Sequence, residues 1–427
     1  MSRIRTACVV GAAVTVVAGL SPAAASPAVT GSRLAAAPAS TEVYPVPADG
    51  VFRLTGAGWG HGRGMSQWGA YQAATEGAKF AAILGFYYPG MTLAPGPARR
   101  IRVLLTSDRG RDLVVRARPT LALALGGGGA RRLAGKPAGC RKAATSWRAR
   151  ATKSGLRLSA YCGKWRTVRT TSARTVTFST RDGLVGTRNG SLRRGYRGTV
   201  TAVRSGSRSV SVVNTVPLEH YLRTVVPAES STSWPREALR AQAVAARTYA
   251  AAEAGARSPG TFDVYDSTRS QVYRAAFAYT KSWRVSARRE FATTDAAIAD
   301  TARLMVTVKG SPVLTQFSSS NGGASAASPL AHMVARADPW DTRATANPRH
   351  FWRDTVTART LAARNPTVGT VRSLEVLTRE GFGPWGGRIA KLRIVGARGT
   401  RVVTGDTAIR ATLGTNSSML TVTSGGS

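Results

Sequence analysis

Short hydrophobic runs in the first half of the chain are separated by turn residues. Residues 101–116, 156–180 and 196–213 are rich in β-branched side chains and are interrupted by Gly, Ser and Asp. Such runs are typical of antiparallel strands joined by turns. The pattern therefore predicts a β-rich module over residues 100–200.

From residue 217 the hydrophobic positions change to helical spacing. Apolar side chains three and four positions apart predict a helix that begins at Leu218 and that Pro227 stops. A longer helix is predicted to begin near Ser233, with Pro235 in its first turn, and to end at Gly255. Its many alanines allow close approach of neighbouring elements, which suits a central, buried helix.

Strand patterns return after this helix. Residues 304–317 are typical of a hairpin that turns at Gly310-Ser311 and leads into a loop rich in serine and glycine. Residues 371–423 predict further strands with glycine turns. The expected fold class is α+β: a mixed domain with a central Ala-rich helix, together with the β-rich module.

The length of 427 residues is enough for two or three domains. Lys and Arg number 60 against 21 Asp and Glu, and the net charge of +39 favours binding to anionic polymers. The hydrophobic content of 43% excludes a long disordered basic tail. Only four His and three Cys are present, without metal-ligand spacing, so we expect no metal and no cofactor.

Residues 1–26 have the pattern of a signal peptide: basic residues at the start, an apolar stretch at Ala7–Leu20, and small residues before a cleavage site. We therefore expect a secreted, cell wall-associated protein. No later segment has eighteen consecutive apolar residues, so the processed chain is expected to be soluble, without a stable membrane span. Residues 27–42 are predicted to form a linker.

Export changes how the cysteines and the charge are interpreted. Cys8 would leave with the signal peptide, and Cys140 and Cys162 would then close a disulfide worth about 3 kcal/mol. The alternative is two unpaired buried thiols. Outside the cytoplasm, a basic protein meets wall polymers and lipid headgroups before nucleic acid. Because no basic run has interleaved aromatic residues, we expect no nucleic acid partner.

Three segments are richer in Gly, Ser, Gln and His than packing requires. The first is GAGWGHGRGMSQWGA at residues 56–70, whose glycines allow a backbone to approach a ligand closely. It matches neither phosphate-loop nor dinucleotide-binding spacing. The alternative interpretation is a structural turn in which Trp59, Met65 and Trp68 are anchors in the core.

The second segment, residues 216–250, contains Glu229 in a predicted non-helical joint between the two helices. Apolar neighbours would partly desolvate this carboxyl group and raise its pKa towards the range where it donates a proton near neutral pH. The alternative is a helix-capping or solvated loop carboxylate.

Two other carboxylates of this segment are interpreted as partners in helical ion pairs. Glu219 precedes Arg223 by four positions, and Glu237 precedes Arg240 by three. Oppositely charged side chains at these spacings are neighbours on a helix surface.

The third segment is QFSSSNGGAS at residues 316–325. A strand that ends in hydroxyls and two glycines can form a rim that hydrogen-bonds a polar ligand. Ser318–Ser320 lack the nucleophile-elbow motif, and His332 gives no evidence of a catalytic triad.

Together the three segments resemble the SpoIID/LytB family, named for stage II sporulation protein D and a modifier of a wall amidase. The family string L-E-x-Y-L-x-x-V-V-x-x-E, followed by W-x-x-E-A-L-x-A-Q-A-V-A-A-R-T-Y, is matched from Leu218 to Glu229 and from Trp234 to Tyr249. GYRGTVTAV before it, the SSSNGG loop and ANPRHFW at 346–352 are also similar to family features.

The order of the segments departs from the family. The G-x-G-H-G-x-G-M-S-Q-x-G-A segment usually comes near the C-terminus of family members, whereas here it opens the mature protein. A circular permutation would place the last strand, 419–423, beside the strand at 51–55. The resemblance then divides the chain into a permuted Gly-rich segment at 43–99, the β-rich module and a SpoIID-like core at 201–423.

The resemblance implies a lytic transglycosylase that cleaves the MurNAc–GlcNAc bond of peptidoglycan strands and leaves 1,6-anhydro ends, with Glu229 as its catalytic residue. Wall amidases and anionic wall polymers are the further partners that we expect. The alternatives are a non-catalytic wall-binding or amidase-modifying protein on the same fold and an exported binder of anionic polymers. The candidates for binding glycan or positioning the catalytic residue are His61, Ser66, Gln67, Gln242, Arg247, Ser319 and Asn321.

Overall fold

The computed structural model describes residues 41–108, 110, 112–257 and 259–423. Contacts divide the chain into Met1–Pro38 and Ala39–Ser427, and all described residues belong to the second unit. The predicted signal peptide and most of the predicted linker lie outside the described residues. No helix within the described ranges is long and apolar enough to cross a membrane.

The predicted α+β class is confirmed, and two large sheets contain most of the strands that the hydrophobic runs predict. Neighbouring strands in both sheets are antiparallel, except for β17 and β5, which are parallel. The eight-stranded sheet has the order β11 (Trp165–Thr171), β10 (Leu156–Tyr161), β9 (Ser146–Ala151), β6 (Asp112–Arg116), β13 (Leu184–Asn189), β14 (Leu192–Arg197), β18 (Phe277–Tyr279), β19 (Val285–Arg288). The seven-stranded sheet has the order β17 (Val264–Tyr265), β5 (Arg100–Leu104), β16 (Val210–Pro217), β15 (Thr199–Arg204), β12 (Thr175–Ser179), β7 (Ala122–Leu125), β8 (Arg131–Arg132).

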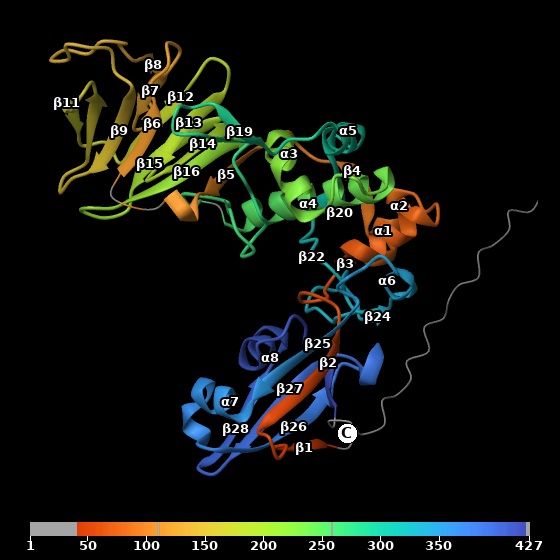
Figure 1. The fold of residues 1–427 in the computed structure, drawn as a ribbon. Helices are drawn as coiled ribbons and strands as arrows, with labels where there is room; N and C mark the ends of the chain where they lie inside the picture. Colours follow the sequence, from red (N-terminus) through yellow and green to blue (C-terminus); the bar gives the residue numbers. More distant parts are fainter. Residues whose placement is uncertain (1–40, 109, 111, 258, 424–427) are drawn as a thin grey trace, which may run out of the picture. The chain divides into compact units, whose positions relative to one another are not determined.

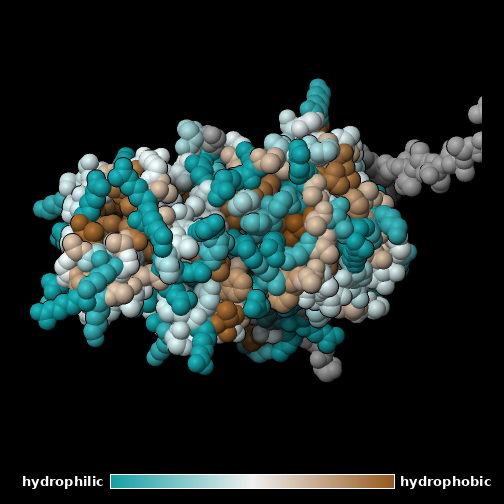
Figure 2. All heavy atoms as spheres, turned by 90° about the horizontal axis from the view of Figure 1, so that it is seen from above, coloured by the Kyte–Doolittle hydropathy of each residue, from teal (hydrophilic) through white to brown (hydrophobic). Residues whose placement is uncertain are grey.

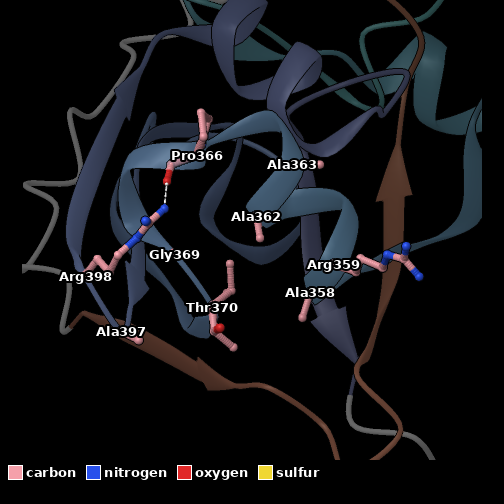
Figure 3. A pocket seen from close by; sticks show the side chains of 10 residues that line it. Ala358, Arg359, Ala362, Ala363, Pro366, Gly369, Thr370, Ala397 and Arg398 are labelled. Carbon is pink, nitrogen blue, oxygen red and sulfur yellow. Dashed lines mark hydrogen bonds between the residues drawn. The ribbon is translucent and has the colours of Figure 1, made fainter.

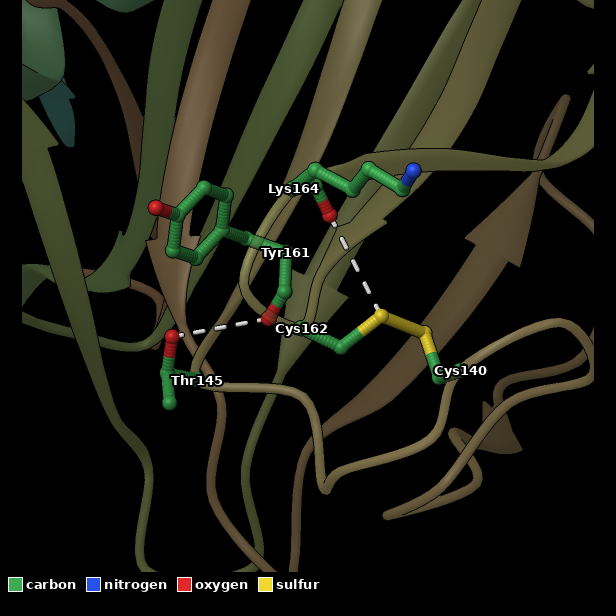
Figure 4. The surroundings of a disulfide bond; sticks show 5 residues. All are labelled: Cys140, Thr145, Tyr161, Cys162 and Lys164. Carbon is green, nitrogen blue, oxygen red and sulfur yellow. Dashed lines mark hydrogen bonds between the residues drawn. A yellow bond between two sulfur atoms is a disulfide. The ribbon is translucent and has the colours of Figure 1, made fainter.

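These two sheets share one hydrophobic cluster, which includes Trp147 from one sheet and Phe178 from the other. The predicted disulfide between Cys140 and Cys162 is present and joins the loop before β9 to the turn after β10 (Figure 4). Strands from beyond residue 200 complete both sheets. The division of the chain at residues 100 and 200 remains a prediction.

Helix α4 (Arg236–Ala256) is the predicted central Ala-rich helix. One set of its side chains, including Ala243 and Ala246, joins the cluster of the two large sheets, and another set, including Val244, packs with α1 (Gln67–Thr75) and α2 (Phe80–Tyr87). Its boundaries differ slightly from the prediction. Pro235 is the N-cap rather than a first-turn residue, and the helix ends one residue after Gly255.

Helix α3 (Leu218–Glu229) does not stop at Pro227 as predicted. Proline removes a single backbone donor, and the last turn is still closed because the Ser230 N–H donates to the Val226 carbonyl at 2.9 Å. The neighbouring Val225 and Val226 side chains are fully buried, which holds this turn against the core. The third helix of this group is α5 (Ala292–Asp300), which packs on both α3 and α4.

The hairpin predicted at 304–317 is present as β20 (Leu304–Val308) and β21 (Ser311–Pro312), and β4 (Thr92–Pro95) pairs with the other edge of β20. Val308 lies opposite Ser311, so the turn residues are Lys309 and Gly310, one position earlier than predicted.

The strands predicted at 371–423 form a second core together with strands from the start of the chain. Its four-stranded sheet has the order β1 (Glu42–Pro45), β26 (Val371–Arg379), β27 (Ile389–Gly396), β28 (Gly399–Thr404). Its three-stranded sheet has the order β25 (Phe351–Thr357), β2 (Val51–Ala57), β29 (Leu420–Thr423). In Figure 1 the red strands β1 and β2 lie among the blue strands of this part.

The expected contact between the last strand and the strand at 51–55 is therefore confirmed: Arg53 lies opposite Thr423, and Gly56 lies opposite Leu420. The circular permutation itself remains a prediction. Helices α7 (Ala358–Arg364) and α8 (Asp406–Leu413), which cover this core, were not predicted. Beside α7 a hollow of about 720 Å³ is lined mainly by small side chains, with Arg359 and Arg398 at its edge (Figure 3). Arg398 donates to the Pro366 carbonyl.

Short elements connect these parts. They are β3 (Met65–Ser66), β22 (Phe317–Ser318), β23 (Ala324–Ser325), β24 (Arg336–Ala337), α6 (Pro339–Arg343) and the 3-10 helices Thr106–Asp108, Pro366–Val368 and Pro384–Gly386.

Candidate active site at the end of helix α3

Glu229 is the last residue of α3 and is half-buried. The sequence predicted it in a non-helical joint, but the helix continues through it. Its Oε1 atom accepts a hydrogen bond of 2.8 Å from the backbone N–H of Val272. The carboxyl group is therefore held against the loop that follows β17.

The pKa of Glu229 is raised above its usual value. Burial is the largest cause, because desolvation disfavours the charged form. The Val272 N–H, the charge of Arg274 and the Gln67 side chain act in the opposite direction without cancelling it. A helix C-terminus also disfavours negative charge. This carboxyl group therefore keeps its proton at a higher pH than an exposed glutamate does.

Gln67 connects the Gly-rich segment to this carboxyl group. It is the first residue of α1, and its side chain lies close enough to Glu229 to lower the pKa of that carboxyl group. Its Nε2 also donates to Oε1 of Gln242, on α4, at 3.3 Å. Gln242 is almost fully buried, and its Nε2 has no hydrogen-bond partner among the described residues. The first and second segments thus meet at a row of three polar side chains.

Aromatic residues lie next to this row. The ring of Trp68, one residue after Gln67, is 4.9 Å from the ring of Trp234, which stands in the loop between α3 and α4. Tyr71, one turn further along α1, is 5.4 Å from the same ring. The loop that follows Glu229 is thereby anchored to α1.

The Gly-rich and Ser-rich segments lie side by side, as expected if both belong to one site. Strands β3 and β22 pair in parallel. Trp59 and Ser320 exchange two backbone hydrogen bonds, of 2.8 and 3.2 Å. The N–H of Trp68 donates to the Ser319 carbonyl at 3.0 Å. Ser319 is half-buried. Its carbonyl bonds Trp68, the residue that follows Gln67.

Two glycines make this pairing possible. A Cβ atom at Gly58 would lie 2.8 Å from the backbone nitrogen of Gly322, and one at Gly322 would lie 2.8 Å from the carbonyl carbon of Ala57. Both glycines also have positive φ, of 77° and 76°. At these positions glycine serves the close approach of two backbones, which favours the structural interpretation of this part of the segment.

Ser66 is fully buried and points into the protein. Its hydroxyl donates to the Asp341 carboxylate at 2.5 Å and accepts the N–H of Gly69, which caps α1. The same carboxylate accepts hydrogen bonds from Ser320 and lies 3.0 Å from Nδ1 of His350. Ser66 therefore positions the start of α1, and its hydroxyl is not available to a ligand.

Asn321 belongs to the same buried network. Its side-chain amide donates to Asp338 at 2.7 Å, and Tyr87 donates to this carboxylate at the same distance. Burial, with the nearby charge of Asp341, raises the pKa of Asp338 to about 6. Sequence reasoning missed both aspartates. The Asp-Pro at 338–339, an N-cap followed by proline at N1, is the signal that could have found α6.

Arg247 also faces inward. Its guanidinium is fully buried and pairs with Glu219 at 2.7 and 2.8 Å. The predicted pair of Glu219 with Arg223 is therefore wrong: Arg223 pairs with Asp295, on α5, at 2.6 Å. A fully buried guanidinium needs a counter-charge more than a surface arginine does, so tertiary contact overrides the helical spacing.

The predicted pair of Glu237 with Arg240 is confirmed at 2.7 Å.

His61 has different surroundings from Glu229. Its Nδ1 accepts the N–H of Arg63, and burial together with the charges of Arg63 and Arg388 lowers its pKa to about 4. None of these groups contacts Glu229, so the structure does not bring His61 into the row of Glu229, Gln67 and Gln242.

Comparison with known proteins identifies the central part of this arrangement. Residues 206–307, which contain α3 and α4, match the family model SpoIID, described as Stage II sporulation protein. Stage II sporulation protein D of Bacillus subtilis is 30% identical over 156 residues, which cover 34% of this chain and 45% of that protein.

An uncharacterized protein of Brachyspira hyodysenteriae is 37% identical over 115 residues, or 26% of this chain and 28% of that protein. The Amidase enhancer of Bacillus subtilis is 52% identical over 42 residues, or 10% of this chain and 6% of that protein. The matches thus span less than half the length of each of these relatives. Residues 206–307 of this chain therefore form a region similar to the SpoIID family.

Proposed function

We propose that this chain is a peptidoglycan lytic transglycosylase in which Glu229 is the only acid and base. The observation that supports the proposal most is the half-buried carboxyl group at the end of α3, whose pKa is raised and whose oxygen is held by the Val272 N–H. A general acid is favoured by a raised pKa and needs a fixed position, and this carboxyl group has both.

The reaction is an internal transfer. Protonated Glu229 donates its proton to the oxygen that links C1 of N-acetylmuramic acid to N-acetylglucosamine, and the C1–oxygen bond breaks. The resulting carboxylate accepts the proton of the muramic C6 hydroxyl, whose oxygen closes onto C1. One bond breaks, one forms, and the proton count of Glu229 is restored. The product is a 1,6-anhydro sugar, and no water is consumed.

The surroundings of Glu229 suit both halves of this cycle. Before the transfer, burial favours the neutral acid. After it, the Val272 N–H and the exposed cation Arg274 stabilise the carboxylate. The Gln67 side chain orients the same group. We assign Gln67, and Gln242 through it, as positioning residues, and partly exposed Ser319 as a residue that contacts glycan.

A single carboxylate also fits an internal transfer better than it fits hydrolysis. Conventional glycosidases use two carboxyl groups, about 5–10 Å apart, that flank the bond. The internal C6 hydroxyl replaces the nucleophile that a second carboxylate would supply or activate.

A second function is favoured by one comparison. The match to the Amidase enhancer has the highest identity of the three described above, although it is short. A protein that binds the wall and modifies an amidase would use the same fold without needing the proton of Glu229. The two functions therefore predict different results for a substitution of Glu229. It should abolish cleavage by a transglycosylase, but it should leave an amidase-modifying function unchanged.

The test uses the mature protein, glycan strands from which stem peptides have been removed, and mass spectrometry of the products. The wild type should release anhydro-terminated fragments, and Glu229→Gln, which keeps shape but cannot donate the proton, should lose activity by about 10²-fold or more. Glu375→Gln, a matched change in the four-stranded sheet, should act like the wild type. Absence of fragments from the wild type, with retained wall binding, would favour the amidase-modifying function instead.

We also propose that the chain acts outside the cytoplasm, in the cell wall. The pattern of residues 1–26 and the net charge of +39 support this location. Hydrophilic side chains cover much of the face shown in Figure 2, with smaller hydrophobic patches between them. Peptidoglycan strands, anionic wall polymers and wall amidases are the partners that this location would offer.

A further inference from the structure

A polar hollow of about 340 Å³ lies on the eight-stranded sheet, outside the region that matches the SpoIID family. It is lined mainly by the strands β6, β9, β11 and β13. The side chains that give it its chemistry are Asp112, Arg148, Trp165, Arg188 and Asn189. This volume is at the lower end of the range for small-molecule sites.

The register of the sheet places these side chains on one face. Val114 lies directly opposite Arg148 on β9 and opposite Arg188 on β13, so the three side chains project to the same side. The opposite side carries the buried Leu113 and Trp147 of the hydrophobic core. The hollow therefore belongs to the face of the sheet that points away from the core.

Arg148 is held in place but is incompletely paired. Its guanidinium lies 4.1 Å from the centre of the Trp165 ring, and one of its nitrogens is 3.9 Å from the Asp112 carboxylate. Its Nε atom is buried without a hydrogen-bond partner in the described part of the chain. Burial and the neighbouring charge of Arg150 lower its pKa. A fixed guanidinium with unused donor capacity is suited to binding an anion.

Positive charge exceeds negative charge around the hollow. The Asp112 carboxylate already accepts two hydrogen bonds from Arg150, at 2.9 and 3.1 Å. The other carboxylate at the rim, Asp108, is bonded to Arg194 at 2.8 Å. Arg148 therefore shares the Asp112 carboxylate with Arg150, and Arg188 has no ion pair among the described residues, so an anionic ligand would complement both.

We propose that this hollow binds a sugar ring that carries a carboxylate. Arg148 and Arg188 would bind the carboxylate, since guanidinium groups match its geometry. Asn189 and Asp112 would bind hydroxyl groups, and Trp165 would provide an apolar wall. A bare phosphate would not use the carboxylate of Asp112, which would repel it. The site does not depend on Glu229 and would hold a glycan chain whether or not the protein cleaves it.

The disulfide supports the position of this site. Trp165 stands on β11, an edge strand that pairs only with β10 and is mostly exposed. Cys162, in the turn before it, is bonded to Cys140 (Figure 4). The N–H of Cys162 also donates to the Lys164 carbonyl. The covalent bond thus restrains the hairpin that brings Trp165 to Arg148.

The test is isothermal titration calorimetry of the mature protein with three probes: muramic acid, N-acetylglucosamine and inorganic phosphate. Muramic acid should bind at least about tenfold more tightly than the other two. Arg148→Gln and Arg188→Gln should each reduce its affinity by about tenfold or more, whereas Arg353→Gln, an exposed arginine on β25, should not. Circular dichroism checks the fold, and Arg188→Gln remains informative if Arg148→Gln is unstable.

The outcomes separate this site from the proposed function. Glu229→Gln should bind muramic acid at the hollow as the wild type does, even if it cleaves nothing. Equal affinities for muramic acid and N-acetylglucosamine would overturn the proposal, as would wild-type affinity in Arg188→Gln. Tighter binding of phosphate than of muramic acid would show a phosphate site instead and would also overturn it.

Discussion

The fully buried guanidinium of Arg247, on α4, pairs with the carboxylate of Glu219, on α3, with nitrogen–oxygen distances of 2.7 and 2.8 Å. This pair joins the central helix to the helix that ends at Glu229. It therefore fixes the direction in which α3 presents its last residue. The sequence did not predict this ion pair, because the helical spacing paired Glu219 with Arg223 instead.

Loss of this pair should cost stability. Glu219→Gln leaves a buried guanidinium without its counter-charge, and we expect the free energy of unfolding to fall by about 3 kcal/mol in urea denaturation. Glu375→Gln removes a pair whose arginine, Arg393, is 40% exposed and stays solvated without its partner, so it should cost about 1 kcal/mol or less. Equal losses in the two variants would contradict the structural role of Glu219.

The close approach of the Gly-rich and Ser-rich segments should depend on Gly58. Gly58→Ala combines a positive φ with a clash at 2.8 Å, so we expect a loss of about 2–3 kcal/mol in the free energy of unfolding. Gly77 also has a positive φ, of 92°, but no atom lies within 4 Å of a Cβ added there. Gly77→Ala should therefore lower the free energy of unfolding by only about 1 kcal/mol. If both variants lose the same stability, the close approach is not important.

Stability should depend on pH through His61. Its folded pKa of about 4 is below the unfolded value of 6.5, so the unfolded chain binds the proton more strongly between these values. The contribution is complete above pH 6.5 and is lost as the pH falls through about 4, by at most about 3 kcal/mol. His61→Gln should remove this part of the slope. An unchanged difference in stability between the two proteins from pH 7 to pH 4 would argue against a neutral imidazole in the folded protein.

The pH dependence of cleavage should respond to Gln67. Only protonated Glu229 can donate, so the rate should fall as the pH rises through the pKa of this group. The Gln67 side chain lowers that pKa, and Gln67→Ala should therefore move the falling limb to higher pH. Gln72→Ala, on the same helix but bonded to Glu76, should leave the limb in place. Initial rates of anhydro-end release across pH provide the measurement, and a limb that moves to lower pH would refute the assigned contact.

The sequence predicted those features that depend on local pattern or on a long motif. The helical spacing before and after Glu229 predicted its helices, and the short apolar, β-branched run at 304–308 predicted β20. Motif similarity linked residues 56–70 to 316–325, and the structure places these segments side by side. Helix α8 was missed because only Ile409 and Leu413 mark its buried side among its larger apolar residues.

The direction of polar side chains could not be predicted in the same way. Ser66 and Asn321 were candidate ligand residues, but both point towards buried aspartates, and Asp341 is 275 positions from Ser66 along the chain. Arg247 was another candidate, and it faces Glu219 inside the protein. A sequence pattern shows that such residues are unusual, whereas only the tertiary structure shows whether they face a ligand or the interior.

Cleavage of denuded glycan in heavy-oxygen water tests the central claim most directly, because it reports whether water attacks C1. If Glu229 acts alone with the muramic C6 hydroxyl, the wild type should release ends that are one water lighter than hydrolysis products and that carry no heavy oxygen, and Glu229→Gln should release none. Reducing ends that carry the heavy oxygen, or equal release by Glu229→Gln, would contradict the account.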